Sequence, residues 1–474
     1  MNDKKDYFFG FLAVFGSNFF SLIISVAITL LFPKILSMID YSYFQLYLFY
    51  SSFIVFGHLG IVDGIYLKCG GAFYETLNFS LLHTQFKLLS IMNIALSLII
   101  FLISVNFVIY EKKIVIFICS IAIILATKRI FYSQLLLATA RMKEYAKVMI
   151  TERLTFITLC LLYFVVVDIT SYVDILIIDL LARCTSYFYV KNMMPEIKES
   201  KDVSINVAIQ KTINDILVGF NLWFSNLTSM LIIGVFRFSI EMRFDVLTFG
   251  MISLAFSAVN AFVVLSNAAS VTMFPIMRRL NEEYIIGYFR GINDILCYLG
   301  LTLQALYFPL YEILFFWLPQ YRESFVYLGV LFPLCIYDIK WTSLESTFLK
   351  VTRKEKMILR INIISCFFSL CIAMCIYNKM FSIVFSMICM VSVFLLKHLM
   401  GIYVIKKELK IKKYSFKVEV LTLMLVGTYY GLFFSLESIK SMIVYLLLLL
   451  IVIVLNMNNI KRDYKTIKKI YTVQ

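Results

Sequence analysis

Apolar residues fill this chain in long runs separated by short polar segments, and the pattern predicts a bundle of membrane-spanning helices. A helix needs about 20 apolar residues to cross the hydrocarbon core of a bilayer. The runs lack the short alternating pattern of membrane β-barrel strands. We expect about fourteen spans, at Tyr7–Phe32, Tyr43–Leu67, Leu88–Tyr110, Ile114–Leu137, Val148–Val167, Tyr172–Val190, Ile213–Phe236, Phe244–Val271, Ile292–Phe316, Phe325–Leu349, Met357–Tyr377, Phe381–Ile405, Val418–Leu436 and Ile439–Leu455.

The most polar stretch, 191–211, lies between the sixth and seventh runs and predicts a linker between two halves. We therefore expect an N-terminal six-helix lobe at 1–194, a cytoplasmic linker at 195–211 and a C-terminal six-helix lobe at 212–410. An additional helix pair with a basic cytoplasmic tail would occupy 411–474. The fold class is an all-α integral membrane protein.

Composition and charge agree with this class. Hydrophobic side chains make up 61% of the chain and charged ones 15%, which excludes an ordinary soluble protein. The net charge of +15 reflects membrane topology rather than a nucleic-acid partner, because Lys and Arg sit in short segments between apolar runs. If the N-terminus is placed inside, the inner segments hold 32 of the 44 Lys and Arg residues, and the outer segments hold 8. Lys397 is counted with the inner segments. We expect both termini in the cytoplasm, with the first run as a span rather than a cleaved signal.

The segment Thr127 to Glu144 has a weaker copy in the second half of the chain. Leu137 and Arg141 match Leu349 and Arg353 at an offset of 212 residues. In both copies the arginine is followed by a Lys-Glu pair. At the same offset Lys128 falls on Lys340. This repeat predicts two parallel lobes, a plan that places a transporter's substrate site at the repeat interface.

These features carry a family resemblance, together with the FGHLGIVDGIYLKCGG segment at Phe56–Gly71 and the FPIMRR segment at Phe274–Arg279. The chain resembles the polysaccharide exporters of the multidrug/oligosaccharidyl-lipid/polysaccharide (MOP) superfamily, and within it the Wzx-type O-antigen flippases. The resemblance implies a MATE-like fold with a central cavity, in the bacterial inner membrane. Its cargo would be an undecaprenyl diphosphate-linked oligosaccharide, moved from the inner to the outer leaflet by alternating access. Polysaccharide polymerase machinery is a candidate partner. Unlike the related lipid II flippases, the chain has no cation in its first span, Tyr7–Phe32.

Apart from the basic residues counted with the inner and outer segments, four cations lie inside the predicted spans, where an ionisable side chain costs about 2.5 to 3.5 kcal/mol on insertion scales. Lys128, Arg129, Arg183 and Lys340 are therefore the candidates for binding a diphosphate. Structural roles compete with this one. Lys128 and Arg129 could extend to the cytoplasmic head groups, Asp338 or Glu345 could neutralise Lys340, and Arg183 could pair with Asp179 on one helix face.

Three carboxylates in the spans, Asp179, Asp338 and Glu345, are candidates for coupling transport to a proton or sodium gradient. His58 lies near Asp63 and is either pH-sensitive or a packing residue. The sequence has no metalloprotease, phosphate-loop or nucleophile-elbow motif, so we expect neither an enzyme nor a cofactor or metal site. The alternatives to a flippase are a multidrug extruder of the same superfamily and a membrane-embedded polysaccharide polymerase or ligase.

Overall fold

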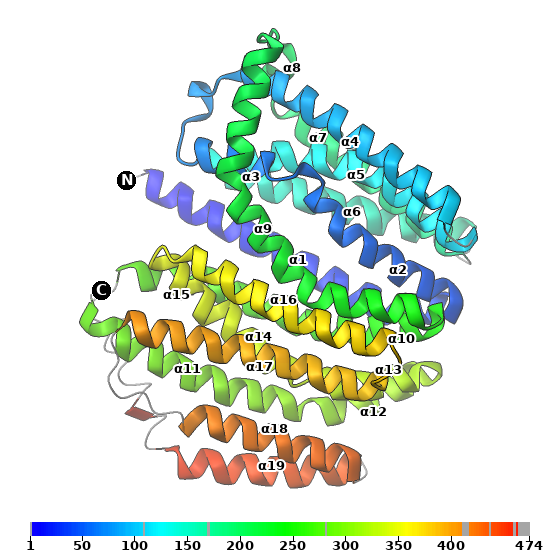
Figure 1. Ribbon diagram of the computed structural model, residues 1–474, viewed down its shortest axis with the longest axis vertical. Coiled ribbons are helices and arrows are strands. Elements are labelled where there is room, and N and C mark those ends of the chain that lie inside the picture. The colour runs from blue at the N-terminus through cyan, green and yellow to red at the C-terminus, as the bar shows by residue number, and fades with distance from the viewer. Residues whose placement is uncertain are drawn as a thin grey trace. The chain divides into compact units, whose positions relative to one another are not determined.

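The computed structural model describes residues 2–107, 110–167, 171–279, 282–409, 417–435, 438–457 and 461–462. These residues form helices joined by short turns and loops, with no strand among them (Figure 1). The all-α prediction is therefore confirmed. The chain divides into two compact units, Met1–Leu227 and Thr228–Gln474. The α-helices are α1 Asn2–Ile35, α2 Met38–Ile54, α3 Ile61–Cys69, α4 Phe79–Phe107, α5 Tyr110–Ala138, α6 Met142–Val166, α7 Tyr172–Asn192, α8 Pro195–Glu199, α9 Ile205–Arg243, α10 Val246–Arg279, α11 Glu282–Ala305, α12 Tyr307–Trp317, α13 Arg322–Leu331, α14 Leu334–Lys340, α15 Ser346–Val351, α16 Glu355–Tyr377, α17 Ile383–Glu408, α18 Lys417–Ser435 and α19 Ser438–Leu455.

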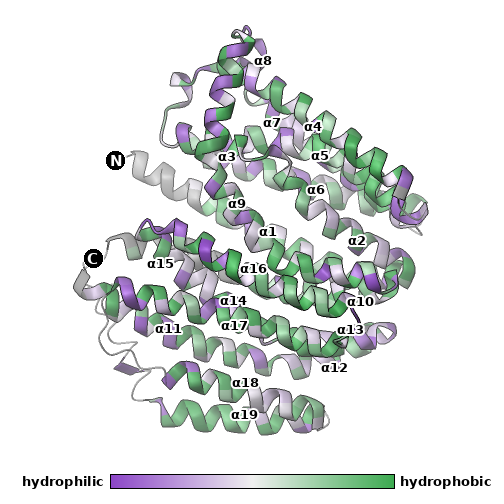
Figure 2. Ribbon diagram, viewed as in Figure 1, coloured by the Kyte–Doolittle hydropathy of each residue, from purple (hydrophilic) through white to green (hydrophobic). Residues whose placement is uncertain are grey.

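Ten of the described helices are long and apolar enough to cross a membrane, and two bent helix pairs raise this number to twelve. Most of them are hydrophobic along their length (Figure 2). The polar helix α7 and the shorter apolar helix α19 account for the remaining predicted spans. The chain is a multi-pass membrane protein, and the count of fourteen stays a prediction. The basic segment 410–416, the tail beyond Arg462 and most side chains of Phe274–Arg279 lie outside the described residues.

In the Met1–Leu227 unit, helix α5 lies at the centre and packs against α2, α3, α4, α6 and α7. Its buried face carries Phe131, Tyr132, Leu135 and Leu136, which join one hydrophobic cluster with residues of α3, α4, α6, α7 and α8. The repeat segment identified in the sequence therefore belongs to the helix around which this unit is built.

The second span is broken where the sequence carries FGHLG. Helix α2 ends at Ile54, a 3-10 turn covers Val55–His58, and α3 begins at Ile61 with a bend of 58°. Leu59 and Gly60 have φ angles of 47° and 85°, the left-handed region that glycine adopts without strain. His58 is buried beside this bend and accepts a hydrogen bond from the Gly60 N–H at its Nδ1, over 3.2 Å. This contact supports the packing role for His58.

Glycines also allow α3 and α9 to cross closely. A Cβ added to Gly64 would overlap the backbone carbonyl of Asp215, and one added to Gly219 would overlap the carbonyl oxygen of Gly60. Across the same crossing, the Lys68 ammonium forms an ion pair with Asp215. The crossing thus holds the bent second span against the helix that follows the linker.

We expect Gly64→Ala and Gly219→Ala each to lower the thermal midpoint of the detergent-solubilised protein by several degrees or to prevent its folding. Backbone atoms would have to move to admit the new methyl group, and overpacking of this kind costs about 1 to 3 kcal/mol. Gly16→Ala is the matched control, because nothing lies within 4 Å of a Cβ at that helical position. Equal midpoints for all three variants would contradict the close crossing.

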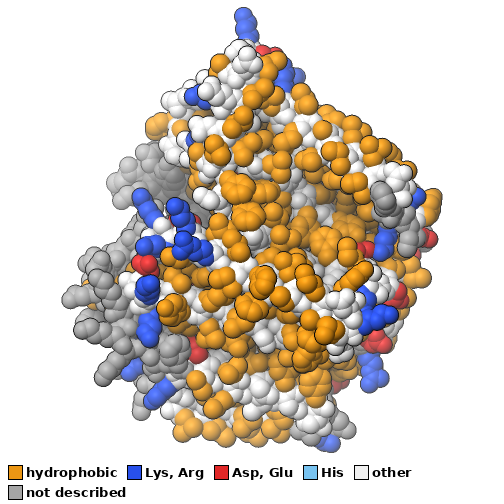
Figure 3. Space-filling view, in the orientation of Figure 1, with side chains coloured by type: hydrophobic (Ala, Val, Ile, Leu, Met, Phe, Trp, Pro, Cys, Tyr) orange, Lys and Arg blue, Asp and Glu red, His pale blue; other side chains and the backbone are white. Residues whose placement is uncertain are grey.

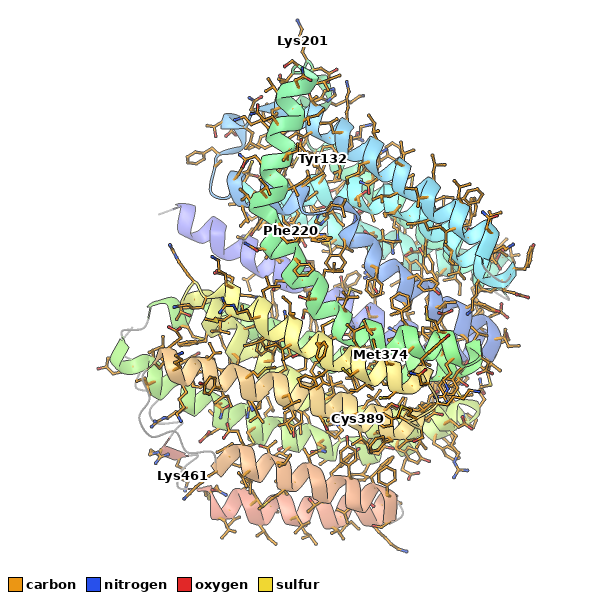
Figure 4. The ribbon with its side chains drawn as sticks, viewed as in Figure 1. Tyr132, Lys201, Phe220, Met374, Cys389 and Lys461 are labelled. Carbon is orange, nitrogen blue, oxygen red and sulfur yellow. The ribbon has the colours of Figure 1, made fainter. Side chains whose placement is uncertain are left out.

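The linker is tied to the first unit by polar contacts. The Tyr74 hydroxyl donates to Glu196 over 2.6 Å and lowers the pKa of that carboxyl. The guanidinium of Arg141 lies 4.4 Å from the Tyr74 ring centroid. Lys87 donates to Asp202 over 2.6 Å, which lowers the pKa of the Asp202 carboxyl. Lys201, beside it, points away from the helices (Figure 4).

In the Thr228–Gln474 unit, aromatic residues dock the last two helices. The Tyr429 hydroxyl of α18 donates to the Gly329 carbonyl of α13 over 2.9 Å, and the Tyr445 hydroxyl of α19 bonds Gln304 of α11 over 2.9 Å. The visible face of this unit is mostly hydrophobic, with Lys and Arg gathered toward the ends of its helices (Figure 3). The tenth span bends by 47° between α13 and α14, where Pro333 removes a backbone hydrogen bond.

Candidate functional site

Both copies of the repeat segment end their helix with the same backbone turn. The Arg141 N–H donates to the Leu136 carbonyl over 2.8 Å, and the Lys354 N–H donates to the Leu349 carbonyl over 2.7 Å. Ala140 and Arg353 have left-handed φ angles of 58° and 56°, as expected for this type of C-cap. Thr139 and Thr352 bond back to the preceding turn in the same way. The loops are therefore structural equivalents at an offset of 213, and the sequence match of Leu137 with Leu349 is wrong by one position.

A π-helical turn at Trp341–Glu345 accounts for the extra residue. In a π turn each N–H bonds the carbonyl five residues back, so the turn takes one residue more than an α turn. Helix α5 is α-helical through the corresponding positions. One extra residue in the π turn returns the offset to 212 upstream of it, which pairs Lys128 with Lys340 as the sequence repeat predicts.

Two of the predicted cations are held by carboxylates inside the first unit. An Arg129 terminal nitrogen lies 2.7 Å from Glu152 of α6. Arg183 donates through Nε to Asp179 over 2.6 Å, which confirms the predicted pair on α7. Asp179 also accepts a hydrogen bond from the Tyr47 hydroxyl of α2. These partners hold the two guanidinium groups in defined orientations.

Lys128 differs from its neighbour Arg129. Its ammonium lies 5.9 Å from the centroid of the Tyr187 ring, and the Lys191 ammonium lies 5.7 Å from the same ring. Among the described residues, no carboxylate lies within 4.0 Å of Lys128. It is half-buried, so it offers a cation to an incoming anion without first breaking an ion pair.

Lys340 lies in a buried ionic cluster of the second unit. Its ammonium is fully buried and lies 3.8 Å from a Glu419 carboxylate oxygen on α18. The same oxygen accepts a hydrogen bond from the Asn293 side chain of α11 over 2.9 Å. In the π turn, Glu345 bonds Nδ1 of His398 on α17. The Lys397 ammonium lies 4.7 Å from the Trp341 ring centroid.

Three members of this cluster were not predicted as site residues: Lys397, His398 and Glu419. Lys397 was counted with the inner loops, but it lies within α17 and is only 2% exposed. The predicted ion-pair partners of Lys340 were Asp338 and Glu345, whereas the structure pairs Lys340 with Glu419. Glu419 and His398 were not singled out, although each is an ionisable residue in or beside an apolar run. The sequence signal that could have identified two of them is the occurrence of two ionisable residues, Lys397 and His398, one turn before Gly401 in an apolar run.

No family model matches the sequence, and no curated protein matches it. Solved structures do match its fold. The lipid II flippase MurJ in an inward closed conformation aligns with a TM-score of 0.69 and 13% identity, over 94% of this chain and 98% of that one. An inward-facing MATE family transporter aligns with a TM-score of 0.53 and 11% identity, over 83% and 100%. A MOP superfamily transporter from Pyrococcus furiosus aligns with a TM-score of 0.50 and 10% identity, over 85% and 94%.

These neighbours are flippases and transporters, and at such identities the likeness concerns the fold. It confirms the MATE-like part of the prediction, whereas the narrower Wzx-type assignment stays a prediction. The chain therefore has the fold of the MOP superfamily of transporters and flippases.

Proposed function

We propose that this protein is a flippase that moves an undecaprenyl diphosphate-linked oligosaccharide, such as an O-antigen repeat unit, from the inner to the outer leaflet by alternating access. The observation that carries the proposal is the pair of cations, Lys128 and Lys340, at equivalent positions of two repeated helices. A diphosphate must cross a region where charge is expensive, so its carrier needs fixed cations. The likeness to a lipid II flippase supports a lipid-linked cargo.

The four cations would act in sequence. Lys128 binds the diphosphate first, because no carboxylate among the described residues lies within 4.0 Å of it. Arg129 and Arg183 then add forked hydrogen bonds from orientations fixed by Glu152 and Asp179. Lys340 becomes available when its long contact with Glu419 opens. A gradient of protons or sodium would drive the cycle through Asp179, Asp338 or Glu345.

The cellular setting belongs to the same proposal. The protein would lie in the bacterial inner membrane with both termini in the cytoplasm, as the charge of its loops predicts. Polymerase machinery would then receive the flipped oligosaccharide. A multidrug extruder would instead need carboxylates free to bind cationic drugs, whereas in the first unit Glu152 and Asp179 are occupied by arginines.

We expect Lys340→Ala to abolish flipping of a diphosphate-linked oligosaccharide in proteoliposomes, and Lys340→Arg to retain part of it. Lys340→Ala leaves Glu419 without its ion-pair partner, so the control is Lys340→Ala combined with Glu419→Gln, which removes both charges. The double variant should fold but remain inactive, because the diphosphate has lost a ligand. Restored flipping would show that Lys340 only neutralises Glu419. Export of a cationic drug instead of the oligosaccharide by the wild-type protein would favour the extruder.

A further inference from the structure

Among the described residues of the Thr228–Gln474 unit, six acidic and basic side chains gather in its interior, and none is more than 9% exposed. They come from α14 with its π turn, from α17 and from α18, and we call them the buried ionic cluster. Its members are Asp338, Lys340, Glu345, Lys397, His398 and Glu419. Lys397 interacts electrostatically with Asp338 and Glu345, and Glu345 with Lys340 and Glu419, so the six form one electrostatic unit.

Within the six members of the cluster, the charges do not balance without an added proton. Its three carboxylates face two ammonium groups, which leaves one negative charge among these described residues when His398 is neutral. An uncompensated charge in a buried site costs several kcal/mol, and one bound proton removes it. The Glu345–His398 pair can carry that proton on either residue, and the two titrate as one coupled system.

The geometry around Glu345 supports exchange of this proton. Its Oε1 bonds the His398 ring, while its Oε2 and the Lys340 ammonium have no hydrogen-bond partner among the described residues. Gly401 of α17 makes room for the carboxyl group, because a Cβ at that position would collide with Oε2. Glu345 ends the π turn, a local distortion that is frequent at functional sites.

Other groups near the cluster are few. Helix α11 contributes Asn293, Asp294 and Cys297, whose thiol bonds Thr422 over 2.7 Å. Helix α14 places the Tyr337 ring 6.1 Å from His398, and α15 carries Lys350. Helix α10 packs on the π turn and has no charged side chain between Val246 and Val263. None of these groups supplies the missing positive charge beside Glu345.

A sodium ion fits this site poorly. Two lysines and a histidine already surround the carboxylates, and a metal cation would be repelled by the ammonium groups at short range. A proton adds the same charge without requiring a shell of oxygen ligands.

We propose that the buried ionic cluster binds and releases one proton at the Glu345–His398 pair, and that this proton is the coupling ion of transport. The role of this proton as the coupling ion rests on the proposed function, but proton binding at the Glu345–His398 pair does not depend on the identity of the cargo. Glu419 connects the site to α18, so the last helix pair takes part in it.

The direct test is a fluorescence titration of the purified full-length protein with Trp223→Phe and Trp317→Phe, which leaves Trp341 as its single tryptophan. Trp341 lies beside Lys397 and within the π turn, so its emission reports the charge of the cluster. We expect one transition between about pH 5 and pH 9, which Glu345→Gln and, independently, His398→Gln remove. Glu408→Gln is the matched control, because that residue ends the same helix α17 and pairs with Lys354 at the surface.

An unchanged transition in both Glu345→Gln and His398→Gln would overturn the proposal. So would a transition that moves when sodium replaces choline at constant ionic strength, because a metal ion would then share the site. In proteoliposomes the wild-type flipping rate should vary with pH and the Glu345→Gln rate should not. If neither the wild-type protein nor any variant flips the oligosaccharide, but the titration behaves as expected, the proposed cargo fails and the proton site stands.

Discussion

Surface polysaccharide should be lost in cells whose only copy of the protein carries both Arg129→Ala and Glu152→Gln, while the protein still inserts at the normal level. Arg129 and Glu152 lie 2.7 Å apart and are both largely buried. Removing Arg129 alone would strand a buried carboxylate, which costs about 3 to 5 kcal/mol. The double variant removes this penalty and leaves only the loss of a cation for the diphosphate.

Two controls separate binding from folding. Glu152→Gln alone keeps Arg129, so it should retain most of the surface polysaccharide. Lys143→Ala removes an exposed cation from the first turn of α6 and should have little effect. The readouts are surface polysaccharide and the amount of protein in the membrane fraction. Normal polysaccharide from the double variant would mean that Arg129 serves only to neutralise Glu152.

Much of the fold was predictable from the sequence, because a membrane helix is encoded locally. Each predicted run lies on a helix or on a bent series of helices. The bend in the tenth span is also encoded locally, because it lies at Pro333 and proline removes a backbone hydrogen bond. The bend at Leu59 and Gly60 was not predicted. Its cause is a left-handed turn whose position depends on the close crossing of α3 and α9.

The candidate site was predictable only in part, because ion pairing depends on helices distant in the sequence. Asp179 and Arg183 lie one turn apart on a single helix, so their contact could be read from spacing. Glu152 and Glu419 reach their partners from other helices, and nothing in their local sequence identifies those partners. The π turn shifts the repeat by one residue, which no comparison without gaps could detect.

Depletion of the protein in its own cell should leave the lipid-linked oligosaccharide in the inner leaflet, because a charged, hydrated head group crosses a bilayer very slowly without a carrier. The oligosaccharide would still be assembled, so the lipid-linked precursor should accumulate as surface polysaccharide declines. Restoring the wild-type protein should reverse both changes, whereas restoring the Arg129→Ala, Glu152→Gln variant should not.

The measurement that tests the central claim most directly is the leaflet distribution of this precursor, read as its accessibility to an impermeant sugar-modifying reagent in right-side-out spheroplasts. The flippase account predicts a precursor that is protected from the reagent after depletion and accessible after restoration. A precursor equally accessible in both states would contradict it, because another protein would then carry the oligosaccharide across the membrane.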